Sequence, residues 1–381
     1  MNEATRLLRD LVSIPSINPM GRDLKGPEIF EHRLTDYLEM FFKDLGVAYE
    51  RQSVAPLRDN IVACYQRSDA SLTLLLEAHQ DTVPVDNMSV DPFGAQVENG
   101  RLHGRGACDI KGGMASMLAM FARTIRERPK RGMNVIMACT VDEEHTFLGV
   151  QRLVKSKIDA HMAVIAEPTQ MRIVNAHKGV MRWHVFMRGR SCHSSAPEQG
   201  VNAIYAMAHV LSAIELYAEK LRASQMDPVL GPPTISVGRI EGGTSANTVP
   251  DRCRIEVDRR LIPGEDMATI VHDFSRAIQE SMPSGLMFEC SEPWLRSPPL
   301  SSCGSDEMVE RLGRAIDSVK GSHKVMAVPY GTDAAAISET GIPAVVFGPG
   351  DIAQAHTADE WVSLQEVEEA SEVLYRLALE V

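Results

Sequence analysis

Apolar runs and amphipathic stretches alternate along the first half of this chain. Runs of consecutive apolar residues predict buried strands at 72–78, 134–141 and 161–166, and a fourth run of this kind occupies 343–348. Between the first two, residues 113–126 carry Met, Leu and Phe at helical spacing, so we predict a helix whose apolar stripe packs in the core. Strands that alternate with helices in this way are typical of an α/β sheet with helices on both faces.

The pattern changes between residues 179 and 292. Strand-like and helix-like segments follow one another there in the order βαββαβ, which is the split-βαβ arrangement with an antiparallel sheet. We interpret 179–292 as a domain inserted into a larger one formed by 1–178 and 293–381. The predicted segments of the insertion are strand 180–188, helix 201–221, strands 234–240 and 253–260, helix 267–280 and strand 286–291.

Composition excludes several classes of protein. The 44% hydrophobic and 24% charged residues are ordinary for a globular chain of 381 residues. A net charge of -12 argues against nucleic-acid binding and against an anionic membrane surface. No apolar run reaches the roughly 20 residues that cross a bilayer, and the N-terminal pattern is that of an amphipathic helix rather than a signal peptide. Seven dispersed cysteines indicate reduced thiols and a cytoplasmic location.

Acidic and histidine residues come directly after the predicted strands. His79 and Asp81 follow the first strand, Glu143 and Glu144 the second, and Glu167 the third. In open α/β sheets, ligands bind in the crevice beyond the carboxyl ends of the strands. We therefore expect these side chains to converge.

Two further residues complete a metal-binding set. Asp109 lies in a glycine-rich turn before the helix at 113, and His356 lies in a loop marked by Pro and Gly. Imidazole and carboxylate are ligands that zinc prefers. Five candidate ligands are too many for one tetrahedral ion, but they suit two ions that share one carboxylate. The sequence therefore predicts a hydrolase that activates water between two metals.

Neighbouring residues in this set have distinguishable tasks. Asp81 shares a face with His79 at the strand end, so its carboxylate can accept a hydrogen bond from the second ring nitrogen of His79. Glu143 and Glu144 are adjacent and diverge, so one can bind metal while the other acts as a general base. Asp109 could cap the following helix instead, although a bridging carboxylate would use both oxygens.

The chain resembles the aminoacylase, acetylornithine deacetylase, succinyl-diaminopimelate desuccinylase and glutamate carboxypeptidase family of dinuclear zinc hydrolases. The resemblance covers nearly the whole chain in order. It implies a zinc-peptidase-like three-layer αβα catalytic domain with an inserted ferredoxin-like lid that dimerises. The motifs that carry it are His79-x-Asp81, Gly104-x-Gly106-x-x-Asp109-x-Lys111-Gly112, Glu143-Glu144 and Glu167-Pro168.

The resemblance assigns roles to the predicted set. It implies that Asp109 bridges two divalent metals, zinc in first place and cobalt or manganese as alternatives, and that a cis peptide follows it. The implied catalytic residues are Glu143 as general base and acid and Asp81 as support for His79. The implied ligands are His79 and Glu167 for the first metal and Glu144 and His356 for the second.

The resemblance also implies substrate contacts. His193 matches a histidine that reaches the active site of the partner subunit in a homodimer, and Arg260 matches an arginine that holds the substrate carboxylate, for which its bidentate fork is suited. Asn247 matches a substrate-binding amide, and Gly331 and Thr332 match a loop that lines the substrate pocket.

Local motifs around these residues are closest to acetylornithine deacetylases. We therefore expect a small-molecule partner, an N-acyl amino acid, whose amide bond is hydrolysed; a dipeptidase or carboxypeptidase is the alternative. A nucleotide-binding protein is disfavoured, because Asp109 stands where the dinucleotide fingerprint needs its third glycine. A serine hydrolase is disfavoured as well, because the chain has no Gly-x-Ser-x-Gly motif. The intact base and ligand set argues against an inactive binding protein.

Overall fold

The computed structural model describes residues 2–224 and 226–380, which form two compact units. The larger unit holds the described residues up to 175, residues 302–327 and those from 332 onward. The smaller unit holds 176–301 and 328–331. Among the described residues, none of the helices combines the length and the apolar character needed to cross a membrane.

The larger unit is built on a mixed sheet whose centre is parallel. β3 pairs in parallel with β6 and β7, and β7 pairs in parallel with β15, so the four predicted apolar runs are confirmed as neighbouring buried strands. The strand order is β1 (Ala48–Ala55), β2 (Arg58–Tyr65), β6 (Asn134–Thr140), β3 (Thr73–His79), β7 (Met162–Ile165), β15 (Ala344–Val346), β8 (Ile173–His177) and β14 (Val325–Val328).

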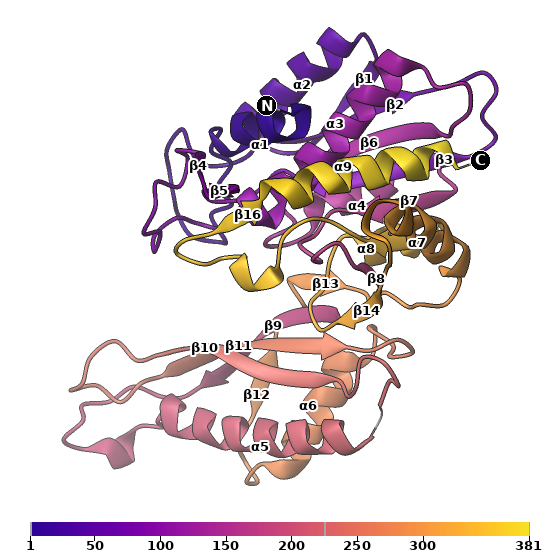
Figure 1. Cartoon of the computed structure of the whole chain (residues 1–381). Helices are drawn as coiled ribbons and strands as arrows, with labels where there is room; N and C mark the ends of the chain where they lie inside the picture. Colours follow the sequence, from indigo (N-terminus) through magenta and orange to yellow (C-terminus); the bar gives the residue numbers. More distant parts are fainter. Residues whose placement is uncertain (1, 225, 381) are drawn as a thin grey trace. The chain divides into compact units, whose positions relative to one another are not determined.

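Helices cover both faces of this sheet. Along β3, Leu74, Leu76 and Ala78 belong to one apolar cluster with five helices, whereas Leu75 and Glu77 point to the opposite face. The five helices are α1 (Glu3–Val12), α2 (His32–Leu45), α3 (Gly112–Glu127), α7 (Asp306–Lys320) and α9 (Leu364–Leu379), of which α9 lies along α3 and α1 (Figure 1). The other layer contains α4 (Leu148–Val154) and α8 (Ala334–Ser338).

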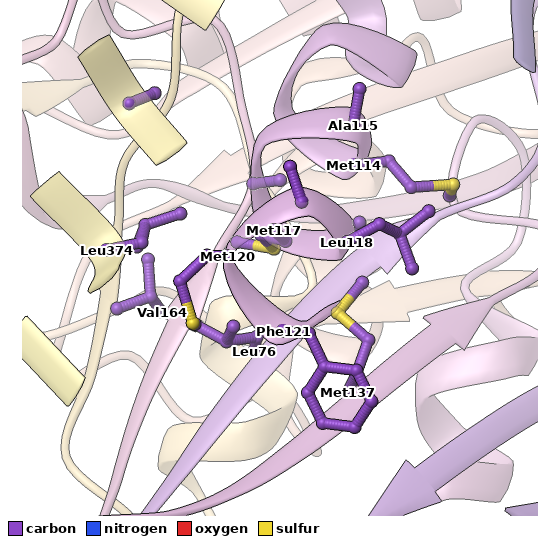
Figure 2. Packing of buried hydrophobic residues seen from close by; sticks show 14 of the residues in the cluster. Leu76, Met114, Ala115, Met117, Leu118, Met120, Phe121, Met137, Val164 and Leu374 are labelled. Atoms are coloured by element: carbon purple, nitrogen blue, oxygen red, sulfur yellow. The ribbon is translucent and has the colours of Figure 1, made fainter. Parts of the chain in front are cut away.

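Helix α3 is the centre of the core. Its side chains Met117, Met120 and Phe121 are fully buried against strand residues such as Leu76 and Met137 (Figure 2). The helix matches the predicted range 113–126 to within one residue at each end, because an apolar stripe of this kind is stabilised by tertiary packing. The short helical segment η1 (Ala107–Lys111) leads directly into α3, and η3 (Ile352–Gln354) lies against η1. Three short strands, β4 (Gln96–Glu98), β5 (Arg101–His103) and β16 (Trp361–Ser363), form a separate sheet.

The smaller unit is a ferredoxin-like βαββαβ fold. Met181, Trp183 and Val185 alternate inward from β9 toward two helices that lie along one face of the antiparallel sheet (Figure 1). The expected insertion 179–292 lies inside this unit, which is wider because β13 also pairs with β9. Its elements are β9 (Gly179–Arg188), η2 (Pro197–Gln199), α5 (Ala203–Ser224), β10 (Thr234–Gly242), β11 (Arg252–Leu261), α6 (Ile270–Ser281), β12 (Phe288–Cys290) and β13 (Leu295–Ser297).

We expect Phe121→Ala to destabilise the larger unit strongly. Phe121 is fully buried, and its ring packs edge-on against Phe42 at a centroid distance of 5.9 Å. Truncation leaves a cavity, so the free energy of unfolding in denaturant should fall by about 3–5 kcal/mol. The control Met40→Ala removes a side chain that is 58% exposed on α2 and should change stability little. Equal effects of the two substitutions would contradict this account of the core.

Candidate metal centre

The strand ends bring the predicted residues to one edge of the sheet. His79 is the last residue of β3, Glu143 and Glu144 follow β6, and Glu167 follows β7. Because these three strands are parallel neighbours, their carboxyl ends lie side by side. Asp109 comes from η1, immediately before α3.

Asp109 lies between two groups of potential ligands. Its Oδ1 is 3.3 Å from Nε2 of His79, and its Oδ2 is 3.4 Å from Nε2 of His356. One group consists of His79, Asp109 and Glu167, and the other of Asp109, Glu144 and His356; within each group the ligand atoms lie within 4.8 Å of one another. The shared carboxylate thus has one oxygen directed at each group.

The ring of His79 is arranged as a metal ligand. Its Nδ1 is 3.0 Å from the main-chain oxygen of Asp81, to which it donates a hydrogen bond. Its Nε2 is buried and has no hydrogen-bond partner among the described residues. Donation through Nδ1 leaves the Nε2 lone pair free for a cation. The prediction that the Asp81 carboxylate accepts this bond needs correction, because that carboxylate lies 3.6 Å from Nδ1 and the carbonyl is closer.

The carboxylate of Asp81 instead organises the turn that follows β6. It accepts hydrogen bonds from the main-chain N–H groups of Glu143 and Glu144, both at 3.2 Å, and from the Asn18 amide at 2.8 Å. Burial alone would raise the pKa of Asp81, but His79, Arg58 and Asn18 together lower it to about 2. Asp81 therefore stays ionised and fixes the backbone of both glutamates.

Glu143 and Glu144 occupy different positions. A carboxylate oxygen of Glu144 is 3.1 Å from Nε2 of His356, whereas Glu143 belongs to neither ligand group and approaches Nε2 of His79 only to 4.0 Å. Burial raises the pKa of Glu143, and the negative charges of Glu144 and Asp109 raise it further.

The electrostatics of the cluster fit a bound cation. Burial raises the pKa of Glu167, and nearby Asp109 and Glu143 raise it further. Burial lowers the pKa of His356, but Asp109 and Glu144 outweigh it and raise this pKa to about 11. A group of carboxylates this close together needs compensating positive charge, which divalent ions supply. The free Nε2 of His79 and the mixed imidazole and carboxylate donors fit zinc chemistry.

Glu360 supports the turn that carries Asp109, and sequence reasoning missed it. It is fully buried, and its carboxylate accepts N–H groups of Gly106 at 3.1 Å, Cys108 at 2.9 Å and Asp109 at 3.0 Å, besides an ion pair with Arg105 at 2.5 Å. These bonds fix the turn that carries Asp109, whose peptide bond to Ile110 is cis as the resemblance implied. The only sequence signal is an acidic residue shortly after His356, which is ordinarily a solvated loop residue.

Four of the five predicted substrate residues lie in the smaller unit. His193 and Asn247 are exposed on adjacent loops, where Ser194 donates its N–H to the Asn247 carbonyl at 3.0 Å. Arg260, on β11, pairs with Asp258 at 2.7 Å. The consecutive residues Gly331 and Thr332 precede α8, and the buried Thr332 hydroxyl accepts a hydrogen bond from the N–H of Ala334 at 3.2 Å. Their predicted place in the substrate pocket stays a prediction.

Sequence comparison decides the family. The profile of peptidase family M20/M25/M40 matches residues 75–380. The chain belongs to this family. It is a hydrolase that acts on C–N bonds, and the family is metal-dependent.

Curated relatives of this M20/M25/M40 chain have deacetylase names. It is 32% identical to the acetylornithine deacetylase of Myxococcus xanthus, covering 90% of each chain. It is 30% identical to that of Pectobacterium carotovorum, covering 97% of this chain and 95% of the relative.

Solved structures share the fold. An M20 family metallo-carboxypeptidase from Sulfolobus solfataricus superposes with a TM-score of 0.81 at 20% identity, covering 100% of this chain and 99% of the other. A dinuclear metal-binding M20 peptidase from Bacillus subtilis gives a TM-score of 0.71 at 18% identity, covering 99% and 96%. These likenesses establish the three-layer catalytic fold with its inserted ferredoxin-like unit.

We expect Glu360→Gln to weaken both the fold and metal binding. The amide would face N–H donors with an NH₂ group and break the buried pair with Arg105, so stability should fall by about 3–5 kcal/mol. Loss of a residue that orients a ligand typically costs ~10–100-fold in metal affinity. Denaturant unfolding of the metal-free protein and zinc titration measure the two effects.

The matched control for Glu360→Gln is Asp359→Asn. Asp359 is the adjacent residue and is exposed, so both quantities should stay near those of the unaltered protein. Reduced stability of Glu360→Gln with unchanged zinc affinity would show that Glu360 does not position Asp109.

Proposed function

We propose that this M20/M25/M40 hydrolase removes the acyl group from an N-acyl amino acid, with N-acetylornithine as the leading candidate substrate. The observation that carries the mechanism is Asp109, whose two oxygens face separate ligand groups. The deacetylase names of the relatives support the substrate class.

Two divalent ions fit this donor set, with zinc as the first candidate. His79 and Glu167 would hold one ion, Glu144 and His356 the other, and Asp109 would bridge them. When bound, such ions lower the pKa of water and polarise a carbonyl oxygen.

Glu143 is the proposed general base and acid. Its carboxylate accepts the proton of the attacking water and returns it to the nitrogen of the leaving amine, which balances the two proton transfers of amide hydrolysis. Glu143 belongs to neither ligand group, so its oxygens are available for this task. Asp81 supports the reaction by holding the main chain of Glu143 and Glu144.

Substrate binding and assembly follow as proposals from the resemblance. Arg260 binds the free carboxylate of the substrate, and Asn247, Gly331 and Thr332 line its binding site. The smaller unit acts as a lid and forms a homodimer in which His193 donates a hydrogen bond to the oxyanion in the partner's active site. A cytoplasmic location stays a prediction, supported by the seven dispersed cysteines of the sequence.

Metal-dependent deacylation is the direct test of this function. With added zinc or cobalt, the purified protein should release acetate from N-acetylornithine, and chelation should abolish that release reversibly. Amidated analogues should be poor substrates if Arg260 needs a carboxylate. Faster hydrolysis of dipeptides than of any N-acyl amino acid would replace the deacylase proposal with a peptidase, and activity that survives exhaustive chelation would overturn the metal mechanism.

The two adjacent glutamates should respond differently to the same substitution. Glu143→Gln should retain both metals and the fold but lower kcat by ~10²–10⁴-fold or more, because the base is lost. Glu144→Gln should instead lower the metal content by one ion, because it removes a ligand. Metal analysis of the two variants, with kcat measured at saturating zinc, separates the roles. The opposite pattern would mean that the assignments are reversed.

A further inference from the structure

Arg58 forms a buried ion network next to the proposed metal centre. It begins β2, its side chain is only 8% exposed, and its guanidinium binds both carboxylate oxygens of Glu31 through Nε at 3.2 and 2.9 Å. On the other side its Nη1 donates to Oδ1 of Asp142 at 2.7 Å. Arg58 therefore joins the start of α2 to the turn that follows β6.

Asn18 links this network to the ligand support. Its side-chain amide donates to Asp142 at 2.9 Å and to Asp81 at 2.8 Å, and the residue is fully buried. Asp81 in turn accepts the N–H groups of Glu143 and Glu144.

Asp142 needs such anchoring. It has a left-handed backbone conformation, with φ of 66°, which is uncommon for a residue that is not glycine. Residues in such regions persist only when their surroundings hold them there. Its second carboxylate oxygen accepts the Thr146 hydroxyl, so both oxygens of Asp142 are used to fix the turn.

We propose that Arg58 is a positioning residue that, through Asp142, holds the 142–144 turn so that Glu144 faces its metal and Glu143 faces the substrate water. This inference rests on the roles proposed above for the two glutamates. Arg58, Glu31 and Asn18 all precede the range matched by the family profile, which begins at residue 75. The N-terminal segment thereby contributes to the reaction without touching substrate or metal.

A buried ion pair could also act on stability alone, so the test must separate the two effects. Arg58→Lys keeps the positive charge but loses the planar fork that reaches Glu31 and Asp142 together. Asp142→Asn keeps the size of the side chain and a residue type that tolerates the left-handed backbone, but it loses the charged bond from the other side. Glu31→Gln disturbs the same network but leaves the bond between Arg58 and Asp142 in place.

Zinc titration against a competing chelator is the deciding experiment, with kcat and KM measured at saturating zinc. Arg58→Lys and Asp142→Asn should each raise the dissociation constant of one of the two ions by ~10–100-fold and lower kcat with KM little changed. The second ion should bind nearly as in the unaltered protein, because His79 and Glu167 are not in this turn.

Two controls sharpen the result. Glu31→Gln should lower the melting temperature with little effect on either zinc affinity. Arg67→Lys makes the same substitution just beyond the other end of β2, at a side chain that is 9% exposed and bonds the carbonyl of Pro129 at 2.6 Å. It too should leave metal binding unchanged.

Lower melting temperatures of Arg58→Lys and Asp142→Asn with both zinc affinities within twofold of the unaltered protein would overturn the inference. Glu144→Gln, measured in the same titration, distinguishes this failure from failure of the proposed function. If Glu144→Gln weakens one ion and the Arg58 variant does not, only the inference fails. If neither variant changes zinc binding, the ligand assignment fails, and the inference fails with it.

Discussion

The burial of negatively charged side chains is the constraint on which the rest of this structure depends. At one edge of the central sheet, carboxylates from several segments are buried within a few ångströms of one another. Such a cluster is unfavourable unless each group finds hydrogen bonds or a counter-charge. The larger unit supplies main-chain N–H groups to Asp81 and Glu360 and guanidinium groups to Asp142 and Glu360. The remaining set around Asp109 has the donors that divalent ions require.

Two kinds of element position these groups: regular parallel strands and irregular turns. Parallel strands deliver His79 and Glu167 from a sheet whose central residues are buried on both faces. The turns that carry Asp109 and Glu144 have irregular backbones, and each is held by a buried acid that contributes no ligand. Glu360 holds the first turn and Asp81 holds the second. Acidic residues therefore serve two purposes in this site: some are candidate ligands, and others hold the candidate ligands in place.

Much of the fold could be predicted from the sequence, because hydrophobic periodicity reports which face of an element is buried. The helix at 113–126 and the βαββαβ order of the insertion were confirmed for this reason. The antiparallel pair of β1 and β2 was missed, since the partly exposed β1 gives a weak pattern. Ligand-type residues were recognisable by type and by their place after strands.

The supporting residues could not be predicted in this way. The roles of Arg58 and Glu360 depend on partners that are 84 and about 250 positions away in sequence, respectively. The hydrogen bond expected between the His79 ring and the Asp81 carboxylate is made by the Asp81 carbonyl instead, for a local reason. Spacing by two places Asp81 and His79 on one face, but it does not decide whether the side chain or the carbonyl reaches the ring.

The discontinuity of the larger unit has a consequence for biosynthesis. Its site draws His79, Asp109, Glu144 and Glu167 from before the smaller unit, but His356 and Glu360 come from after it. During synthesis, β3, β6, β7 and most of the acids therefore emerge long before the last candidate ligand and the anchor of Asp109. The candidate ligand set and its buried support are therefore complete only after the C-terminal segment has been synthesised.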